Sequence, residues 1–178
     1  MSQVANPYAA PAARVDDVGR NPEAEAIRKA HISHEASIKA VGALYYLSSA
    51  LLVVAGAGGL IAMSTGGDDV GMVAIFVVLA VGMFFVGRGV RALRRWARIV
   101  GSVLAGIGLL SFPVGTIINL YILYLFLSKK GGTVFSPEYQ DVIAATPDIK
   151  YRVSILVWIF LGLLALLVGA AVVVPQLK

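Results

Sequence analysis

The chain has 178 residues, of which 58% are hydrophobic and only 14% are charged, and its mean hydropathy is +0.83. A soluble domain of this length cannot bury so large an apolar fraction, and the apolar residues lie in long uncharged runs that are typical of membrane-spanning helices. Cysteine is absent, which excludes disulfides, thiolate nucleophiles and cysteine metal sites. The net charge of +5 comes from basic residues beside the apolar runs, which indicates orientation in a membrane and contact with anionic lipid rather than nucleic-acid binding.

The N-terminal part is polar. Residues 1–20 are rich in Ala and Pro and show no apolar periodicity, which predicts a disordered tail. A helix start follows, because Asn21 is a good N-cap residue and Pro22 suits the first helical position. Residues 21–39 mix polar and apolar side chains, so we expect an interfacial helix that leads into a transmembrane bundle over residues 40–178.

Three uncharged apolar runs predict membrane spans, at about 40–63, 70–86 and 153–174. Small residues four positions apart, Ala55 with Gly59 and Gly101 with Ala105, predict close helix contacts. The spans carry no Asp, Glu, Lys, Arg or His at mid-depth. Ion-coupled transporters usually place such residues there, so this absence disfavours that class.

A cluster of arginines follows the second run. If the helix continues through the cluster, four of them share one face, because steps of three and four residues return to the same side: Arg88, Arg91, Arg95 and Arg98. Together with Lys129 and Lys130 they are candidates for binding anionic lipid or a partner protein. A simpler role is a positive-inside anchor, and the two roles are compatible.

The central stretch, residues 99–127, decides the topology. As one helix it is about 43 Å long, against about 30 Å of hydrocarbon, whereas a split at Pro113 gives two short arms of about 21 Å each. We therefore expect a hairpin whose break is formed by Pro113, Gly115, Thr116 and Asn119, and Asn119 is expected to bond another helix or the turn backbone. The alternative is a four-span protein in which this stretch is one long kinked helix.

Charge favours the hairpin. A hairpin places fourteen of the fifteen Lys and Arg residues on one side and leaves only Lys178 on the other, whereas a single kinked span sends Lys129, Lys130, Lys150 and Arg152 across. A re-entrant hairpin gives the same sidedness and stays open as a second form. The expected fold is thus an all-α bundle of about five membrane segments with a cytoplasmic N-terminus and a periplasmic C-terminus.

A short helix is expected before the last span. Ser136, Pro137 and Glu138 form a cap, a proline and an acidic first turn, and apolar residues then recur at helical spacing. The pattern predicts an interfacial amphipathic helix at about 136–146.

Several motifs together resemble a group of small, uncharacterised bacterial polytopic inner-membrane proteins. They are the Arg91–Arg98 segment with Trp96, the Phe112–Thr116 break of the form FPxGT, Tyr121 with Leu123, Asn6-Pro7-Tyr8, and the segment from Pro137 to Arg152. The resemblance covers most of the chain beyond the tail. It implies a location in the bacterial inner membrane and implies no activity or site residues.

His31, His34 and Glu35 are the only cluster with metal-ligand residue types. They share one side of a helix, but a zinc site needs three or four ligands with supporting partners, and these are the only histidines. We therefore treat them as weak metal candidates and expect neither a metal nor another cofactor. No nucleophile elbow or phosphate-binding glycine loop occurs in a suitable context, so we expect no enzyme activity.

These features favour an accessory or scaffold protein that binds anionic membrane lipid or a membrane partner through its cytoplasmic face. The alternative is a small oligomeric transporter or channel whose path lies at the broken central helices. A membrane enzyme comes third, since it would have to recruit metal ligands from a second chain to the His31 side. A homo-oligomer is compatible with the first two functions.

Overall fold

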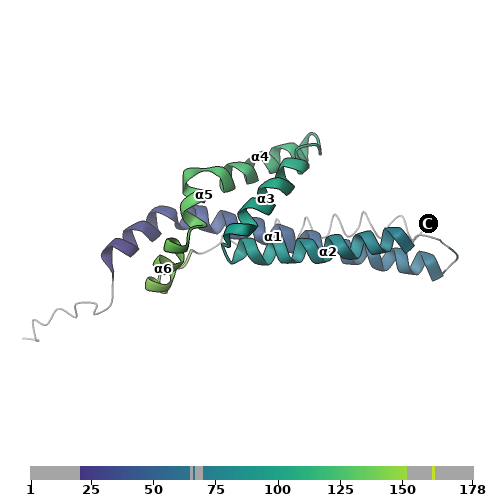
Figure 1. Cartoon of the computed structure of the whole chain (residues 1–178), viewed down its shortest axis with the longest axis horizontal. Helices are drawn as coiled ribbons and strands as arrows, with labels where there is room; N and C mark the ends of the chain where they lie inside the picture. The colour runs from purple at the N-terminus through teal and green to yellow at the C-terminus, as the bar shows by residue number, and fades with distance from the viewer. Residues whose placement is uncertain (1–20, 65, 67–69, 152–161, 163–178) are drawn as a thin grey trace, which may run out of the picture.

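The computed structural model describes residues 21–64, 66, 70–151 and 162. Within these ranges the regular structure is helical and includes no strand, which confirms the all-α class. The helices in chain order are α1 (Pro22–Ser64), α2 (Val70–Arg91), α3 (Arg95–Gly108), α4 (Val114–Leu127), α5 (Lys129–Val134) and α6 (Pro137–Ala145) (Figure 1). The predicted tail at 1–20 and, apart from residue 162, the predicted last span at 153–174 lie outside the described residues.

α1 joins the segment predicted as an interfacial helix and the first predicted span into one continuous helix. Asn21 caps its start, because its Oδ1 accepts hydrogen bonds from the backbone N–H groups of Glu23 and Ala24 at 3.1 and 3.2 Å. No Gly or Pro interrupts residues 23–41, so nothing ends the helix where the polar part meets the apolar part. At about 64 Å, α1 is twice as long as the hydrocarbon is thick, and part of it must extend beyond any bilayer it crosses.

α1 and α2 pack against each other through glycines. A Cβ added at Gly87 would lie 3.0 Å from the carbonyl oxygen of Gly42, so the two backbones cross closely there. Further along, Ser49 Oγ donates a hydrogen bond to the carbonyl of Ala80 at 2.7 Å. Gly59 of the predicted Ala55–Gly59 pair contacts Val73.

The outer faces of this helix pair are apolar and exposed. α1 and α2 are both long and apolar enough to cross a membrane, and only 11% and 22% of their most apolar windows are buried. Large side chains such as Ile61 and Val78 are 68% and 70% exposed. A core helix of a soluble protein buries such a face, so these helices need an apolar environment that the described residues do not supply.

α2 ends at Arg91, so the helix does not continue through the arginine cluster, and the condition under which the four arginines share one face is not met. Leu93 adopts a left-handed backbone conformation with φ of 52°. The N–H of Arg94 bonds to the carbonyl of Gly89 at 2.9 Å, and the N–H of Leu93 bonds to that of Val90 at 3.0 Å, which together form a Schellman C-cap. Because the chain turns here, Arg95 and Arg98 leave the face of Arg88 and Arg91 and belong to α3.

The central stretch is a helical hairpin, and the alternative of one long kinked helix is wrong. α3 and α4 pack side by side, with the ring of Phe126 lying on Gly101. Pro113 is the N-cap residue of α4, one position before the first helical residue. Along the long axis of the molecule, the α3–α4 tip stops short of the far end of the α1–α2 pair (Figure 1).

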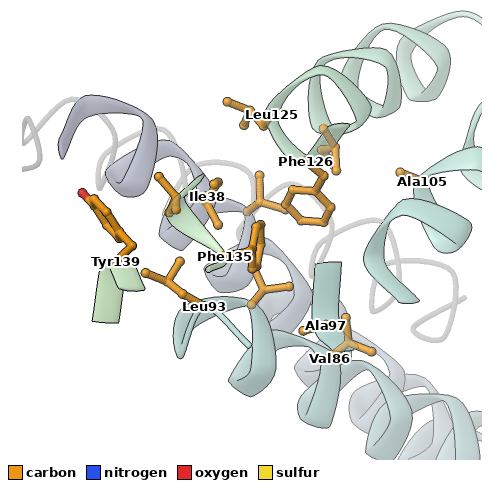
Figure 2. Close-up of a cluster of buried hydrophobic side chains, with 13 residues drawn as sticks. Ile38, Val86, Leu93, Ala97, Ala105, Leu125, Phe126, Phe135 and Tyr139 are labelled. Carbon is orange, nitrogen blue, oxygen red and sulfur yellow. The ribbon is translucent and has the colours of Figure 1, made fainter. Parts of the chain in front are cut away.

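The second half of the described chain folds back onto the N-terminal half of α1. The α2–α3 turn, the end of α4, α5 and α6 gather there (Figure 1) and form, with residues 21–45 of α1, what we call the basal lobe. Its core is apolar and closely packed, as Figure 2 shows, with Phe126 and Phe135 in edge-to-face contact at a centroid distance of 5.4 Å. The largest fully buried side chains of the described chain lie in it: Tyr139, Phe126, Phe135, Ile38, Val90 and Val134.

Candidate functional site

The most buried polar cluster of the basal lobe centres on Glu35, which is 3% exposed. Lys39 Nζ lies 2.6 Å from Oε1 of Glu35, and Arg28 Nε lies 3.0 Å from Oε2. Arg28 Nη2 donates to Oε1 at 3.3 Å, and the Tyr139 hydroxyl donates to Oε2 at 3.0 Å. Burial, followed by the charge of Glu35, raises the pKa of Tyr139, which keeps the hydroxyl protonated as a donor.

Local sequence positions each member of this Glu35 cluster. Arg28, Glu35 and Lys39 lie seven and four residues apart on α1 and so face the same side. Tyr139 is held by the cap of α6, where Ser136 Oγ accepts a hydrogen bond from the Tyr139 backbone N–H at 3.2 Å. Sequence reasoning considered Glu35 only as a weak metal ligand, and it missed Arg28 and Tyr139 because the helix that supplies the tyrosine lies far away in the chain.

The side chains of the three weak metal candidates contact three different sets of partners. His31 Nδ1 lies 2.9 Å from the carbonyl oxygen of Ile27, and His34 Nε2 lies 2.8 Å from that of Leu125. Glu35 is engaged by the basic residues described above. The described residues contain no group of three or more His, Cys, Asp or Glu side chains that could hold a metal ion.

The C-terminal end of α4 is capped by two side chains from other helices. His34 of α1 binds the Leu125 carbonyl, and Arg98 Nε of α3 donates a hydrogen bond to the Phe126 carbonyl at 2.7 Å. Donors near the last carbonyls of a helix satisfy groups that have no partner within the helix. Arg98, a predicted lipid-binding candidate, thereby joins the two arms of the hairpin, and His34 joins the hairpin to α1.

The other predicted basic candidates lie exposed on the basal lobe. They are Arg88, Arg91, Arg95, Lys129 and Lys130. Together with Arg94, which is also exposed but is not among the candidates, they form what we call the basic surface. A hollow of about 450 Å³ lies among Arg88, Arg91, Arg94 and Trp96. The indole of Trp96 is 47% exposed, as is typical of aromatic residues at a membrane interface.

The residues of the predicted break hold the hairpin turn. Thr116 Oγ1 donates to the carbonyl of Leu109 at 2.7 Å, and its backbone N–H bonds to the carbonyl of Ser111 at 3.2 Å. Asn119 Nδ2 donates to the carbonyl of Gly115 at 2.8 Å, and its side chain packs on Gly108. Gly115 itself contacts Ser111 too closely for a side chain. The polar groups near Pro113 are thus used inside the turn.

The basal lobe therefore combines a buried carboxylate with a larger number of cations, some buried and some exposed. Such an arrangement can bind anions. Ser128 Oγ lies 3.3 Å from His34 Nε2, and the same nitrogen lies 2.8 Å from the Leu125 carbonyl oxygen at the end of α4. No known family model, curated protein or solved structure matches the chain.

Proposed function

We propose that this chain is a multi-pass protein of the bacterial inner membrane that has no catalytic site of its own and serves as an accessory or scaffold component. In this proposal the basal lobe faces the cytoplasm and binds anionic lipid headgroups. The observation that carries it is the position of charge. The arginines of the basic surface begin in the last turn of α2, where its exposed apolar face ends.

Helix length supports this placement. α2 is about 33 Å long, which matches about 30 Å of hydrocarbon and leaves its last turn, with Arg88 and Arg91, at the headgroups. The positive-inside rule then puts the basal lobe in the cytoplasm and the α1–α2 connection in the periplasm. With the last span predicted at 153–174, the C-terminus is periplasmic.

We place the α3–α4 hairpin as a re-entrant hairpin that enters from the cytoplasmic side and returns to it. Each arm is about 21 Å long, too short to reach the far headgroups. The tip is apolar, since Leu110 and Phe112 are each 86% exposed. A turn that emerges into water does not need such side chains, whereas a turn that ends in hydrocarbon does.

The backbone of the tip also suits hydrocarbon. The N–H groups of Leu109, Leu110 and Ser111 bond to carbonyls of α3, and Thr116 satisfies two further carbonyls of the turn. Pro113 has no N–H to satisfy. Unmet backbone groups at membrane depth cost several kcal/mol each, so this internal bonding supports a hairpin that ends inside the bilayer.

A transporter or channel remains the second candidate, and one observation favours it. A groove of about 430 Å³ separates α1 from the hairpin and carries the polar side chains of Tyr45, Ser48 and Asn119 among apolar ones. However, Asn119 Nδ2 is bonded to Gly115, and the Tyr45 hydroxyl donates to the Gly101 carbonyl at 3.3 Å. The groove therefore offers few free polar groups to a solute.

The proposal is tested by extracting the full chain from native membranes in a lipid-retaining polymer and comparing its lipids with the bulk membrane by mass spectrometry. We expect enrichment of anionic phospholipid that falls several-fold in an Arg88→Gln/Arg95→Gln variant, because each surface cation contributes about 1 kcal/mol. The matched control, Arg14→Gln/Arg20→Gln, removes the same charge from the predicted tail. Equal enrichment in all three proteins contradicts the proposal, and a homo-oligomer that carries only lipid of bulk composition favours the transporter.

A further inference from the structure

A cavity of about 440 Å³ opens in the basal lobe between α1, the end of α6 and residues 146–151. Its volume lies within the range of small-ligand sites, about 300–1,000 Å³. Four cationic side chains line it: Arg28 and Lys39 from α1, Arg91 from the end of α2, and Lys150. Among the described residues that line it, Glu35 is the only carboxylate.

Glu35 does not balance this charge. Its carboxylate is shared by Arg28, Lys39 and the Tyr139 hydroxyl, and four cations against one carboxylate leave an excess of three positive charges. Arg91 and Lys150 make no ion pair within the described part of the chain. Like charges held around one cavity repel each other unless an anion lies between them, so the site is electrostatically complementary to an anionic group.

Two of the cations are held in place by packing. The Cγ atom of Arg91 crosses Gly42 so closely that a Cβ at this glycine would lie 2.5 Å from it. Arg28 is 7% exposed, and its Nε makes no hydrogen bond, although it lies within ion-pair distance of Glu35. Glu35 Oε2, 3.0 Å from this Nε, and Thr146 Oγ1, which accepts a hydrogen bond from Nη1 at 3.4 Å, hold the Arg28 guanidinium at the wall of the cavity.

We propose that this cavity binds the phosphate group of an anionic ligand, either a phospholipid headgroup or a soluble phosphate ester. Guanidinium groups match phosphate oxygens in geometry, and the lysines add compact positive charge. Ala36, Ala40 and Ala43 form an apolar wall beside the cations, which can accept the carbon skeleton that bears the phosphate. The inference rests on the proposed membrane function, because that placement brings the cavity to the bilayer edge.

The test compares two double variants that lose equal charge. Arg91→Gln/Lys150→Gln removes cations of the cavity but keeps a Cγ atom where the arginine packs on Gly42, whereas Arg14→Gln/Arg20→Gln removes two cations from the segment that the sequence predicts as a tail. The full chain is purified in neutral detergent, and its thermal unfolding midpoint is titrated with sodium phosphate against sodium chloride of equal ionic strength. A second arm titrates phosphatidylglycerol against phosphatidylcholine. Equal elution volumes and equal midpoints without ligand show that both variants fold.

We expect a saturable rise of the midpoint in the wild type and in Arg14→Gln/Arg20→Gln, and a binding constant at least about tenfold weaker in Arg91→Gln/Lys150→Gln. A response to phosphatidylglycerol alone identifies a lipid headgroup, and a response to sodium phosphate as well identifies a site open to soluble esters. Absence of any rise in the wild type, or equal weakening in both variants, overturns the inference. If Arg88→Gln/Arg95→Gln loses lipid enrichment but its midpoint still rises with sodium phosphate, lipid binding at the basic surface and phosphate binding in the cavity are separate.

Discussion

Replacing Glu35 by Gln removes the one negative charge that compensates Arg28 and Lys39. The side chains of Arg28 and Glu35 are only 8% and 4% exposed, so water screens their attraction little. The Lys39 side chain is 39% exposed, so its ion pair with Glu35 adds little to stability, because exposed ion pairs contribute about 1 kcal/mol or less. The free energy of unfolding is therefore expected to fall by about 3–5 kcal/mol, because Arg28 is left buried without a counter-ion.

The free energy of unfolding is measured by titrating the protein in mixed micelles with a denaturing detergent while the helical circular dichroism is recorded. Asp141→Asn is the matched control, since it removes a carboxylate from an exposed position of α6 and is expected to change stability by less than about 0.5 kcal/mol. Adding Arg28→Met to Glu35→Gln should restore much of the loss, because it removes the uncompensated charge. A loss below about 0.5 kcal/mol in Glu35→Gln, or no recovery in the double variant, refutes this reasoning.

Three further substitutions probe packing and depth in the same micelles or in phosphatidylcholine bilayers. Gly42→Ala should lower the free energy of unfolding by about 1–3 kcal/mol, because its Cβ meets α2. Gly58→Ala, which has open space around it, is the control and should be neutral or raise stability by up to about 1 kcal/mol. Equal effects of the two substitutions would contradict the close crossing of α1 and α2. Gly101→Ala should lower stability by about 1–3 kcal/mol, because its Cβ displaces the ring of Phe126 on α4. Gly106→Ala, with open space around it in the same helix, is the control. If Gly101→Ala is as stable as Gly106→Ala, the two arms do not pack as described. Phe112→Asp should lower stability in bilayers by about 2.5–3.5 kcal/mol if the hairpin tip ends in hydrocarbon. A change near zero would show that the tip lies in water.

The hairpin could be predicted because its signals are local. Pro113 and Gly115 interrupt an apolar run that is too long for one span, and the positive charge on both flanks predicts that the chain returns to the side from which it came. Thr116 and Asn119 then fulfil roles that their position near the break suggests, bonding carbonyls of the turn. Gly101 and Ala105, whose spacing predicts a close helix contact, are likewise buried, and Gly101 lies against Phe126 of α4.

The α2–α3 turn and the Glu35 cluster could not be predicted, because both depend on tertiary contacts. Leu93 takes a left-handed conformation that favours glycine, and it does so while its side chain is 3% exposed in the basal core. No Gly or Pro occurs in residues 90–100, and Gly89, the one glycine of the arginine cluster, lies four residues before Leu93. Similarly, Tyr139 lies 104 residues from Glu35 in the chain, and helix periodicity carries no information about such a pair.

The direct test of the re-entrant hairpin is cysteine labelling, for which the chain is suited because it contains no cysteine. Single cysteines are introduced at Ser64, Ala92, Ser111 and Thr133 and exposed to a membrane-impermeant maleimide in intact cells and in inverted vesicles. We expect Ser64→Cys to react only from the periplasm, Ala92→Cys and Thr133→Cys only from the cytoplasm, and Ser111→Cys from neither side. Periplasmic labelling at Ser111→Cys would show that the hairpin crosses the membrane, and periplasmic labelling at Thr133→Cys would contradict its return to the basic side.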